Sequence, residues 1–135
     1  MSTRACYTFK DEHNAYHVYK HFDGYPSGAE QWIRAALDHA WKLPRFEADD
    51  FGAAFIAANK GENGGGNCRL MHSGDIKQMA SADIEYRYEI EAHNGVLHVT
   101  VYSTDYWDSP IEEKLWSGPL STMKSWADQY EKETA

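Results

Sequence analysis

DIEYRYEIEAHNGVLHVTVYST, residues 83–104, is the stretch that decides the fold of this 135-residue chain. Its apolar members are Ile84, Tyr86, Tyr88 and Ile90 before Asn94-Gly95, and Leu97, Val99 and Val101 after it. Apolar and polar residues alternate on both sides, which is typical of strands with one buried face. Asn-Gly is the strongest short-range signal for a two-residue turn. The stretch therefore predicts a β-hairpin.

The turn also fixes the register of this hairpin. A two-residue loop pairs His93 with Val96, which sets Ile90 and Tyr88 opposite valines on the core side. The outer side then carries three cross-strand pairs, Glu91–His98, Glu89–Thr100 and Arg87–Tyr102. Turn chemistry and hydrophobic pattern agree independently, so they specify one register.

A second hairpin is predicted at the start of the chain. Residues 5–10 and 15–20 alternate, and the polar break Asp11–Asn14 between them has the length of a four-residue loop. If Lys10 pairs with Ala15, Tyr7 and Phe9 share one face with the apolar residues of the returning strand. This register gathers the apolar side chains on a single face.

Three helices are predicted from apolar spacing. Ser27 with Glu30 matches a capping box, and apolar residues follow at three- and four-residue steps to Ala40, with Glu30 and Arg34 on the outer side. A second, alanine-rich helix is expected over 47–60 and should be largely buried, with a core stripe of Phe51, Ala54, Phe55 and Ala58. The third follows Gly118-Pro119.

Shorter strands complete the prediction. Cys68–Met71 is one, residues 111–116 form a mixed strand expected at a sheet edge, and Ile76–Met79 is a further candidate. The order is ββ-αα-ββββ-α over a single domain, 1–135. Strands in runs and helices in runs indicate an α+β fold: an antiparallel sheet of about five or six strands with helices over one face.

The chain is acidic and rich in aromatic residues. Its formal net charge is −8, which disfavours a nucleic-acid binder that works by phosphate neutralisation. The charge is compatible with docking on a basic surface and equally with plain solubility. Aromatics make up 14% of the residues, with five Trp and nine Tyr. They can form a dense core, and any surplus on the surface favours contact with a partner.

Neither a metal site nor a cofactor is expected. Cys6 and Cys68 match no metal or redox spacing. His17 and His21 fall on one strand face about 13 Å apart, too far for one metal ion. No apolar signal region or membrane-spanning stretch is present in the sequence, so we expect a cytoplasmic protein with reduced thiols and no membrane contact.

One set of residues carries a catalytic alternative. Glu91, His98 and Arg87, with Glu89 beside them, share the outer face of the second hairpin, where they could act as base, acid and charge stabiliser in phosphodiester cleavage. Small microbial ribonucleases use a similar arrangement on a sheet. The competing interpretation is a row of ordinary cross-strand pairs, each contributing about 0.2–1 kcal/mol. No nucleophile-elbow, zincin or Cys-x-x-Cys motif is present, which disfavours an enzyme.

The segment Tyr19-Lys20-His21-Phe22-Asp23-Gly24-Tyr25-Pro26, preceded by Thr3-Arg4, carries a resemblance. It resembles small phage and prophage proteins that open Met-x-Thr-Arg and carry Tyr-x-His-aromatic-Asp-Gly-Tyr-Pro after a first hairpin. The match covers about the first quarter of the chain. It implies a mobile-element origin and no particular activity.

Two interpretations of this motif stay open. The turn residues have a sufficient backbone reason, since Gly24 permits positive φ and Asp23 can cap the turn. Alternatively, they form a recognition patch. The residues expected to contact a partner are Tyr19, His21, Phe22, Asp23, Tyr25, Tyr102 and Trp107.

The leading hypothesis is a phage- or prophage-type accessory protein that binds another macromolecule, a protein rather than a nucleic acid. Inhibition of a host or defence protein is one form of it. The alternative is a small nuclease-like hydrolase that uses Glu91, His98 and Arg87. The identity of the partner and the oligomeric state are left open by the sequence.

Overall fold

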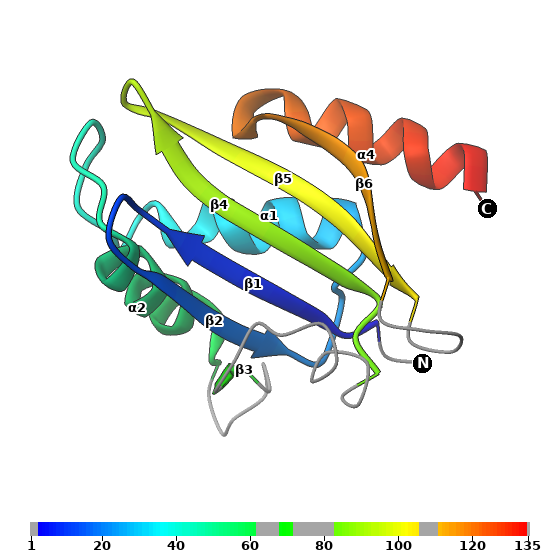
Figure 1. The fold of residues 1–135 in the computed structure, drawn as a ribbon, viewed down its shortest axis with the longest axis horizontal. Helices are drawn as coiled ribbons and strands as arrows, with labels where there is room; N and C mark the ends of the chain where they lie inside the picture. Colours follow the sequence, from blue (N-terminus) through cyan, green and yellow to red (C-terminus); the bar gives the residue numbers. More distant parts are fainter. Residues whose placement is uncertain (1–2, 62–67, 72–82, 106–110, 135) are drawn as a thin grey trace.

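Six strands form one sheet whose face is covered by helices (Figure 1). The computed structural model describes residues 3–61, 68–71, 83–105 and 111–134. Within them the elements are β1 (Ala5–Lys10), β2 (Ala15–Lys20), α1 (Pro26–Ala36), α2 (Ala48–Asn59), β3 (Cys68–Met71), β4 (Tyr86–His93), β5 (Val96–Asp105), β6 (Ile111–Pro119) and α4 (Leu120–Thr134). The predicted α+β class and element order are confirmed.

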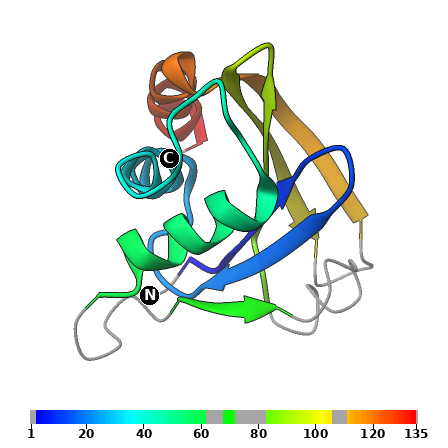
Figure 2. The same ribbon diagram turned by 90° about the vertical axis from the view of Figure 1, so that its left-hand side faces the viewer.

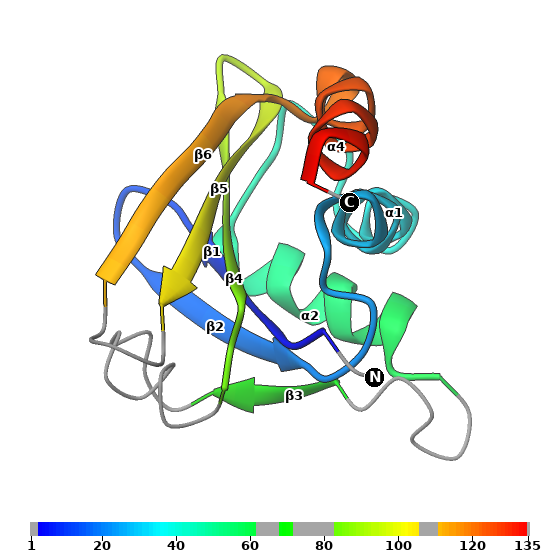
Figure 3. The ribbon, with the colours of Figure 1, turned by 90° about the vertical axis from the view of Figure 1, so that its right-hand side faces the viewer.

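The helices lie on a single face of the sheet, as predicted. Two side views show them as one layer, with α1 between α2 and α4 (Figures 2 and 3). The opposite face of the strands carries no helix in the described part of the chain (Figure 3).

The strand order β3-β2-β1-β4-β5-β6 contains one pair that the sequence prediction missed. β1 and β4 run parallel, with Tyr7 beside Tyr88 and Phe9 beside Ile90, whereas the other neighbours are antiparallel. The expectation of a wholly antiparallel sheet is therefore wrong at this pair. The alternation of apolar and polar residues assigns each residue to a face of the sheet. It does not specify which strand lies beside its own strand, or whether the two run parallel or antiparallel.

Both hairpins have the predicted register. Lys10 pairs with Ala15 in the first, and His93 pairs with Val96 in the second. The outer pairs Glu91–His98, Glu89–Thr100 and Arg87–Tyr102 are all present. β6 lies at one edge of the sheet, as expected, and β3 at the other. The candidate strand Ile76–Met79 lies outside the described residues.

Aromatic rings occupy the centre of the core between the sheet and the helices. The ring of Tyr7 lies 4.5 Å from that of Phe55 and 5.2 Å from that of Tyr88, and Phe9 packs on Phe51 at 5.8 Å. All five side chains are essentially inaccessible to solvent. The aromatic content of the sequence is therefore largely used in packing.

The predicted capping box at α1 is wrong. Ser27 lies inside the helix, and its backbone nitrogen and hydroxyl both donate to Glu131 of α4, at 2.8 and 2.7 Å. Glu30, expected on the outer side, is only 4% exposed and accepts two hydrogen bonds from Arg34. The carboxylate of Glu131, distant in sequence, therefore accepts the hydrogen bond from the Ser27 nitrogen that the sequence pattern assigned to Glu30.

Two further expectations about burial are corrected. Ile84 packs with Cys6 and Tyr19 in a separate cluster on the other face of the sheet, because β4 becomes regular only at Tyr86. The second helix is not largely buried: Ala53 is exposed, and Ala58 is only partly buried. α2 thus covers the sheet with one face and leaves the opposite face accessible.

Candidate functional site

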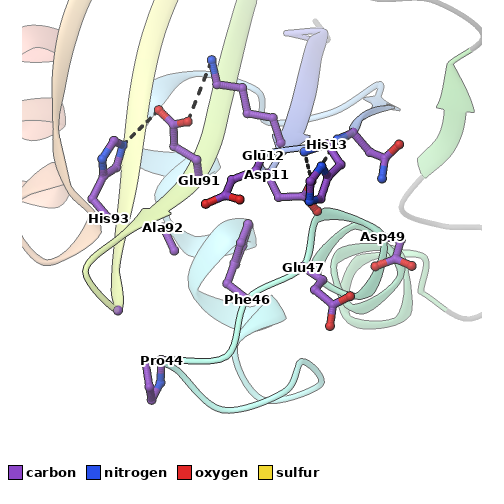
Figure 4. A pocket seen from close by; sticks show the side chains of 13 residues that line it. Asp11, Glu12, His13, Pro44, Phe46, Glu47, Asp49, Glu91, Ala92 and His93 are labelled. Atoms are coloured by element: carbon purple, nitrogen blue, oxygen red, sulfur yellow. Dashed lines mark hydrogen bonds and ion pairs between the residues drawn. The ribbon is translucent and has the colours of Figure 1, made fainter.

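Three segments meet at one end of the sheet and border a cavity of about 560 Å³ (Figure 4). They are the β1–β2 loop, the chain that leads into α2, and the end of the β4–β5 hairpin. The lining residues are Lys10, Asp11, Glu12, His13, Asn14, Pro44, Phe46, Glu47, Asp49, Glu91, Ala92, His93 and Gly95. We call this the hairpin-end cavity. It exists because the parallel pairing of β1 with β4 brings the two hairpins side by side.

The lining of this cavity is strongly acidic. It holds five carboxylates against one lysine, Lys10. The Lys10 ammonium lies 2.7 Å from Glu89 and 3.9 Å from Glu91, and the hydrogen bond with Glu89 raises its pKa. Glu89 balances the charge of Lys10 but lies outside the lining. The five carboxylates of the lining therefore leave the cavity with an excess of negative charge.

Asp11 has a structural part in building this site. One carboxylate oxygen accepts hydrogen bonds from the backbone nitrogens of His13 and Asn14, and the other accepts from that of Ala48 at 2.8 Å. These bonds lower the pKa of Asp11, with the one from Ala48 contributing most. Asp11 therefore closes the β1–β2 loop and caps α2, whose own N-cap residue makes no side-chain capping bond.

Glu91 and His93 form the best-defined polar pair of the lining. Their side chains lie 3.1 Å apart (Figure 4), and the His93 ring lies 4.7 Å from that of His98. Phe46 adds an aromatic ring to the same lining and is held by Phe51 at 5.4 Å. Among the described residues, no group of three or more His, Cys, Asp or Glu side chains is placed to hold a metal ion.

The predicted catalytic residues do not share this cavity. Glu91 lines it, whereas Arg87 and His98 are not part of the lining. The Arg87 guanidinium is bound by Glu112 at 2.5 and 3.0 Å and by Glu89 at 2.9 Å, and it lies over the ring of Tyr102. Burial alone would lower the pKa of Arg87, but these hydrogen bonds raise it. These bonds use three of its five N–H donors, and the two carboxylates balance its charge, which disfavours phosphate binding.

The Asp23–Pro26 turn has a clear structural function. The Gly24 nitrogen donates to the Thr3 oxygen at 2.8 Å, and the Gly24 oxygen accepts from the Tyr88 hydroxyl. The oxygen of Asp23 accepts from the Trp32 indole at 3.1 Å. A Cβ at Gly24 would lie 2.7 Å from the Thr3 oxygen, so only glycine fits. Thr3 and the Tyr19–Pro26 segment, the two parts of the sequence motif, are therefore in direct contact.

The side chains of this corner differ in accessibility. Phe22 is 44% and Tyr25 38% exposed, and the His21 ring packs edge-on against Phe22 at 4.6 Å. Tyr19 is 8% exposed, with its hydroxyl 2.6 Å from the His21 ring nitrogen. Of the remaining residues predicted to contact a partner, Tyr102 is partly buried beneath Arg87, and Trp107 lies outside the described residues.

Sequence reasoning missed the hairpin-end cavity as a site. It identified Asp11–Asn14 as a loop and Glu91 as an outer-face residue, but it did not relate them. The acidic start of α2 was recognised only as a helix signal. The missing information is the parallel neighbour of β1, which brings these segments to the same end of the sheet (Figure 1).

No family model, curated protein or solved structure matches this chain. None of the described helices has both the length and the apolar character needed to cross a membrane. Cys6 and Cys68 are free and buried, and burial raises the pKa of the Cys6 thiol to about 12. Any function assigned to the protein therefore rests on the chemistry of its own surface.

Proposed function

We propose that this chain is a cytoplasmic, phage- or prophage-type accessory protein that acts by binding another protein. The hairpin-end cavity receives a cationic side chain of that partner. The observation that carries the proposal is a concave site of about 560 Å³ lined by five carboxylates, in which the one lysine is already paired. The phage origin rests on the sequence resemblance alone.

The chemistry of the lining favours arginine or lysine as the group that enters. Hydrogen bonds between such cations and carboxylates are roughly twice as strong as neutral ones. Glu12 and Glu47 are exposed members of the lining. Glu47 lies 3.5 Å from the exposed Arg45, an ion pair that a partner cation can displace, and the Phe46 ring offers a face for a cation–π contact. A net charge of −8 steers a basic protein toward the surface and repels nucleic acid.

The test is capture from a nuclease-treated bacterial lysate on the immobilised full chain, read by mass spectrometry. The cavity variant carries Glu12→Lys and Glu47→Lys, two exposed positions of the lining. The matched control carries Glu113→Lys and Glu133→Lys, which make the same charge change at exposed positions outside the lining. We expect one stoichiometric partner on the wild type and the control, and loss of that partner on the cavity variant.

Two further arms separate the alternatives. If Phe22→Ala with Tyr25→Ala loses the partner while the cavity variant keeps it, the contact lies at the corner and the cavity assignment is wrong. Absence of a nuclease-resistant partner on the wild type contradicts the binding function. Cleavage of an RNA substrate that is abolished by His98→Ala at unchanged stability would establish the hydrolase instead.

A further inference from the structure

A second cavity lies beside the β4–β5 turn. It has a volume of about 500 Å³ and is bordered by α1, by the chain that follows it, by the turn and by the start of α4. Half of the ten lining residues have apolar side chains: Leu37, Leu43, Val96, Leu97 and Leu120. We call it the helix–turn groove. Gly95 lines both cavities, so the two are neighbours at one turn.

The groove presents apolar surface to solvent. Leu97 and Leu120, at 4% and 7% exposed, are part of the core, whereas Val96 is 47% exposed. Leu37 and Leu43 are partly buried against the same core. Its volume lies within the range of small-molecule sites, about 300–1,000 Å³. The wall therefore suits an apolar group a few carbons in size.

The charged side chains at the groove are arranged as ion pairs. Arg34 of α1 and Lys124 of α4 are both exposed, and Glu30 is the one acid of the lining. Glu30 is buried and bound by two nitrogens of Arg34, at 2.9 and 3.2 Å. Lys124 is paired in turn with Asp128, which lies outside the lining, so each cation of the groove has one acidic partner.

Donors remain on both cations for a ligand. Arginine has five N–H donors and lysine three. The contacts of Arg34 with Glu30 use two, and that of Lys124 with Asp128, at 2.8 Å, uses one. Glu30, Arg34 and Lys124 line the same cavity, so the three charges lie near one another across α1 and α4.

We propose that the helix–turn groove binds a free, medium-chain alkyl carboxylate. The alkyl chain lies along the leucine and valine wall, and the carboxylate accepts hydrogen bonds from Lys124 and Arg34. Hydrogen-bond complementarity decides the ligand: Arg34 and Lys124 keep unused N–H donors, both oxygens of Glu30 are occupied by Arg34, and a quaternary ammonium head offers no acceptor. This inference does not depend on the protein-binding function, which uses the hairpin-end cavity.

The ligand series gives the first measurement. Calorimetric titration of the full chain at low salt with octanoate, nonanoate and decanoate, each below its micelle concentration, should give saturable binding. We expect affinity to rise about fourfold for each methylene that the groove buries. Decyltrimethylammonium, with the same chain and the opposite charge, is expected to bind more weakly. Equal or tighter binding of the cation overturns the proposal, as does absence of saturable binding by decanoate.

A matched pair of variants locates the carboxylate. Lys124→Gln removes an exposed cation of the groove, and Lys132→Gln removes an exposed cation farther along the same helix. We expect Lys124→Gln to weaken decanoate binding by up to about fivefold, the usual range for an exposed charge pair, and Lys132→Gln to leave it unchanged. Amide shifts in NMR spectra should centre on Val96 and Leu97. Equal affinities of the two variants, or shifts centred elsewhere, would refute the site.

Discussion

Two tyrosines in the core provide the sharpest test of the structure. Tyr7 and Tyr88 are both inaccessible to solvent, and their rings stack 5.2 Å apart. The Tyr88 hydroxyl donates to the Gly24 oxygen, whereas the Tyr7 hydroxyl has no hydrogen-bond partner among the described residues. Replacing either by Phe removes one oxygen from the same region of the core. The two substitutions should nevertheless differ in their effect on stability.

Tyr88→Phe leaves the buried Gly24 oxygen without its donor, which costs about 1–3 kcal/mol of unfolding free energy. At about 2 kcal/mol and a urea m-value of about 1.5 kcal/mol/M, the unfolding midpoint falls by about 1.3 M. Tyr7→Phe removes a buried hydroxyl that has lost its bonds to water and gained no hydrogen bond among the described residues. The urea unfolding midpoint of this variant should therefore equal or exceed that of the wild type.

Urea unfolding followed by circular dichroism measures both midpoints. The m-values should match the wild type, since neither change alters the surface exposed on unfolding. If Tyr7→Phe destabilises as much as Tyr88→Phe, the Tyr7 hydroxyl has a partner in solution and the reasoning is wrong. A Tyr88→Phe midpoint equal to that of the wild type would show that the bond to Gly24 contributes nothing.

Three further predictions concern caps and the tight turn. The depressed pKa of Asp11 stabilises the fold above the unfolded value of about 3.9, and this contribution is lost as pH falls through the folded pKa. Asp11→Ala should therefore lower the urea midpoint at neutral pH, and the variant should lose less stability than the wild type when the pH is lowered. Urea unfolding of both proteins over a series of pH values measures the difference. Glu131→Ala should lower the free energy of unfolding by about 1–2 kcal/mol. Ser27→Ala should cost less in the Glu131→Ala background than in the wild type, and a double-mutant cycle measures this difference. Gly24→Ala places a Cβ 2.7 Å from a backbone oxygen and should cost about 1–3 kcal/mol in thermal unfolding, while Phe22→Ala, at an exposed position, stays within about 0.5 kcal/mol.

The two hairpins could be predicted down to single residue pairs because their determinants are local. Asn94-Gly95 dictates a two-residue turn, and the alternation on both sides admits one register only. The α2 bounds were also close to the prediction, since acidic residues at its start and Gly61 beyond its end are local signals. Each of these features depends on residues within a few positions of one another.

The candidate sites could not be predicted in the same way. Glu91 was recognised as a polar outer-face residue, but its neighbours in the cavity come from the β1–β2 loop and the start of α2. The helix–turn groove combines Val96 with residues of α1 and α4. For the turn at Gly24 the sequence left a structural interpretation and a recognition patch open, and the backbone contacts with Thr3 and Tyr88 supply the structural reason.

The sequence by itself determined the faces of the strands, the register of both hairpins and the demand for capping at each helix start. The tertiary structure alone decided which residue caps each helix: Glu131 caps α1 and Asp11 caps α2. It also decided that β4 lies parallel to β1. The physical reason is that a backbone N–H or a strand edge requires a partner without specifying one, and the chain supplies it from whichever segment the packing of the core brings near.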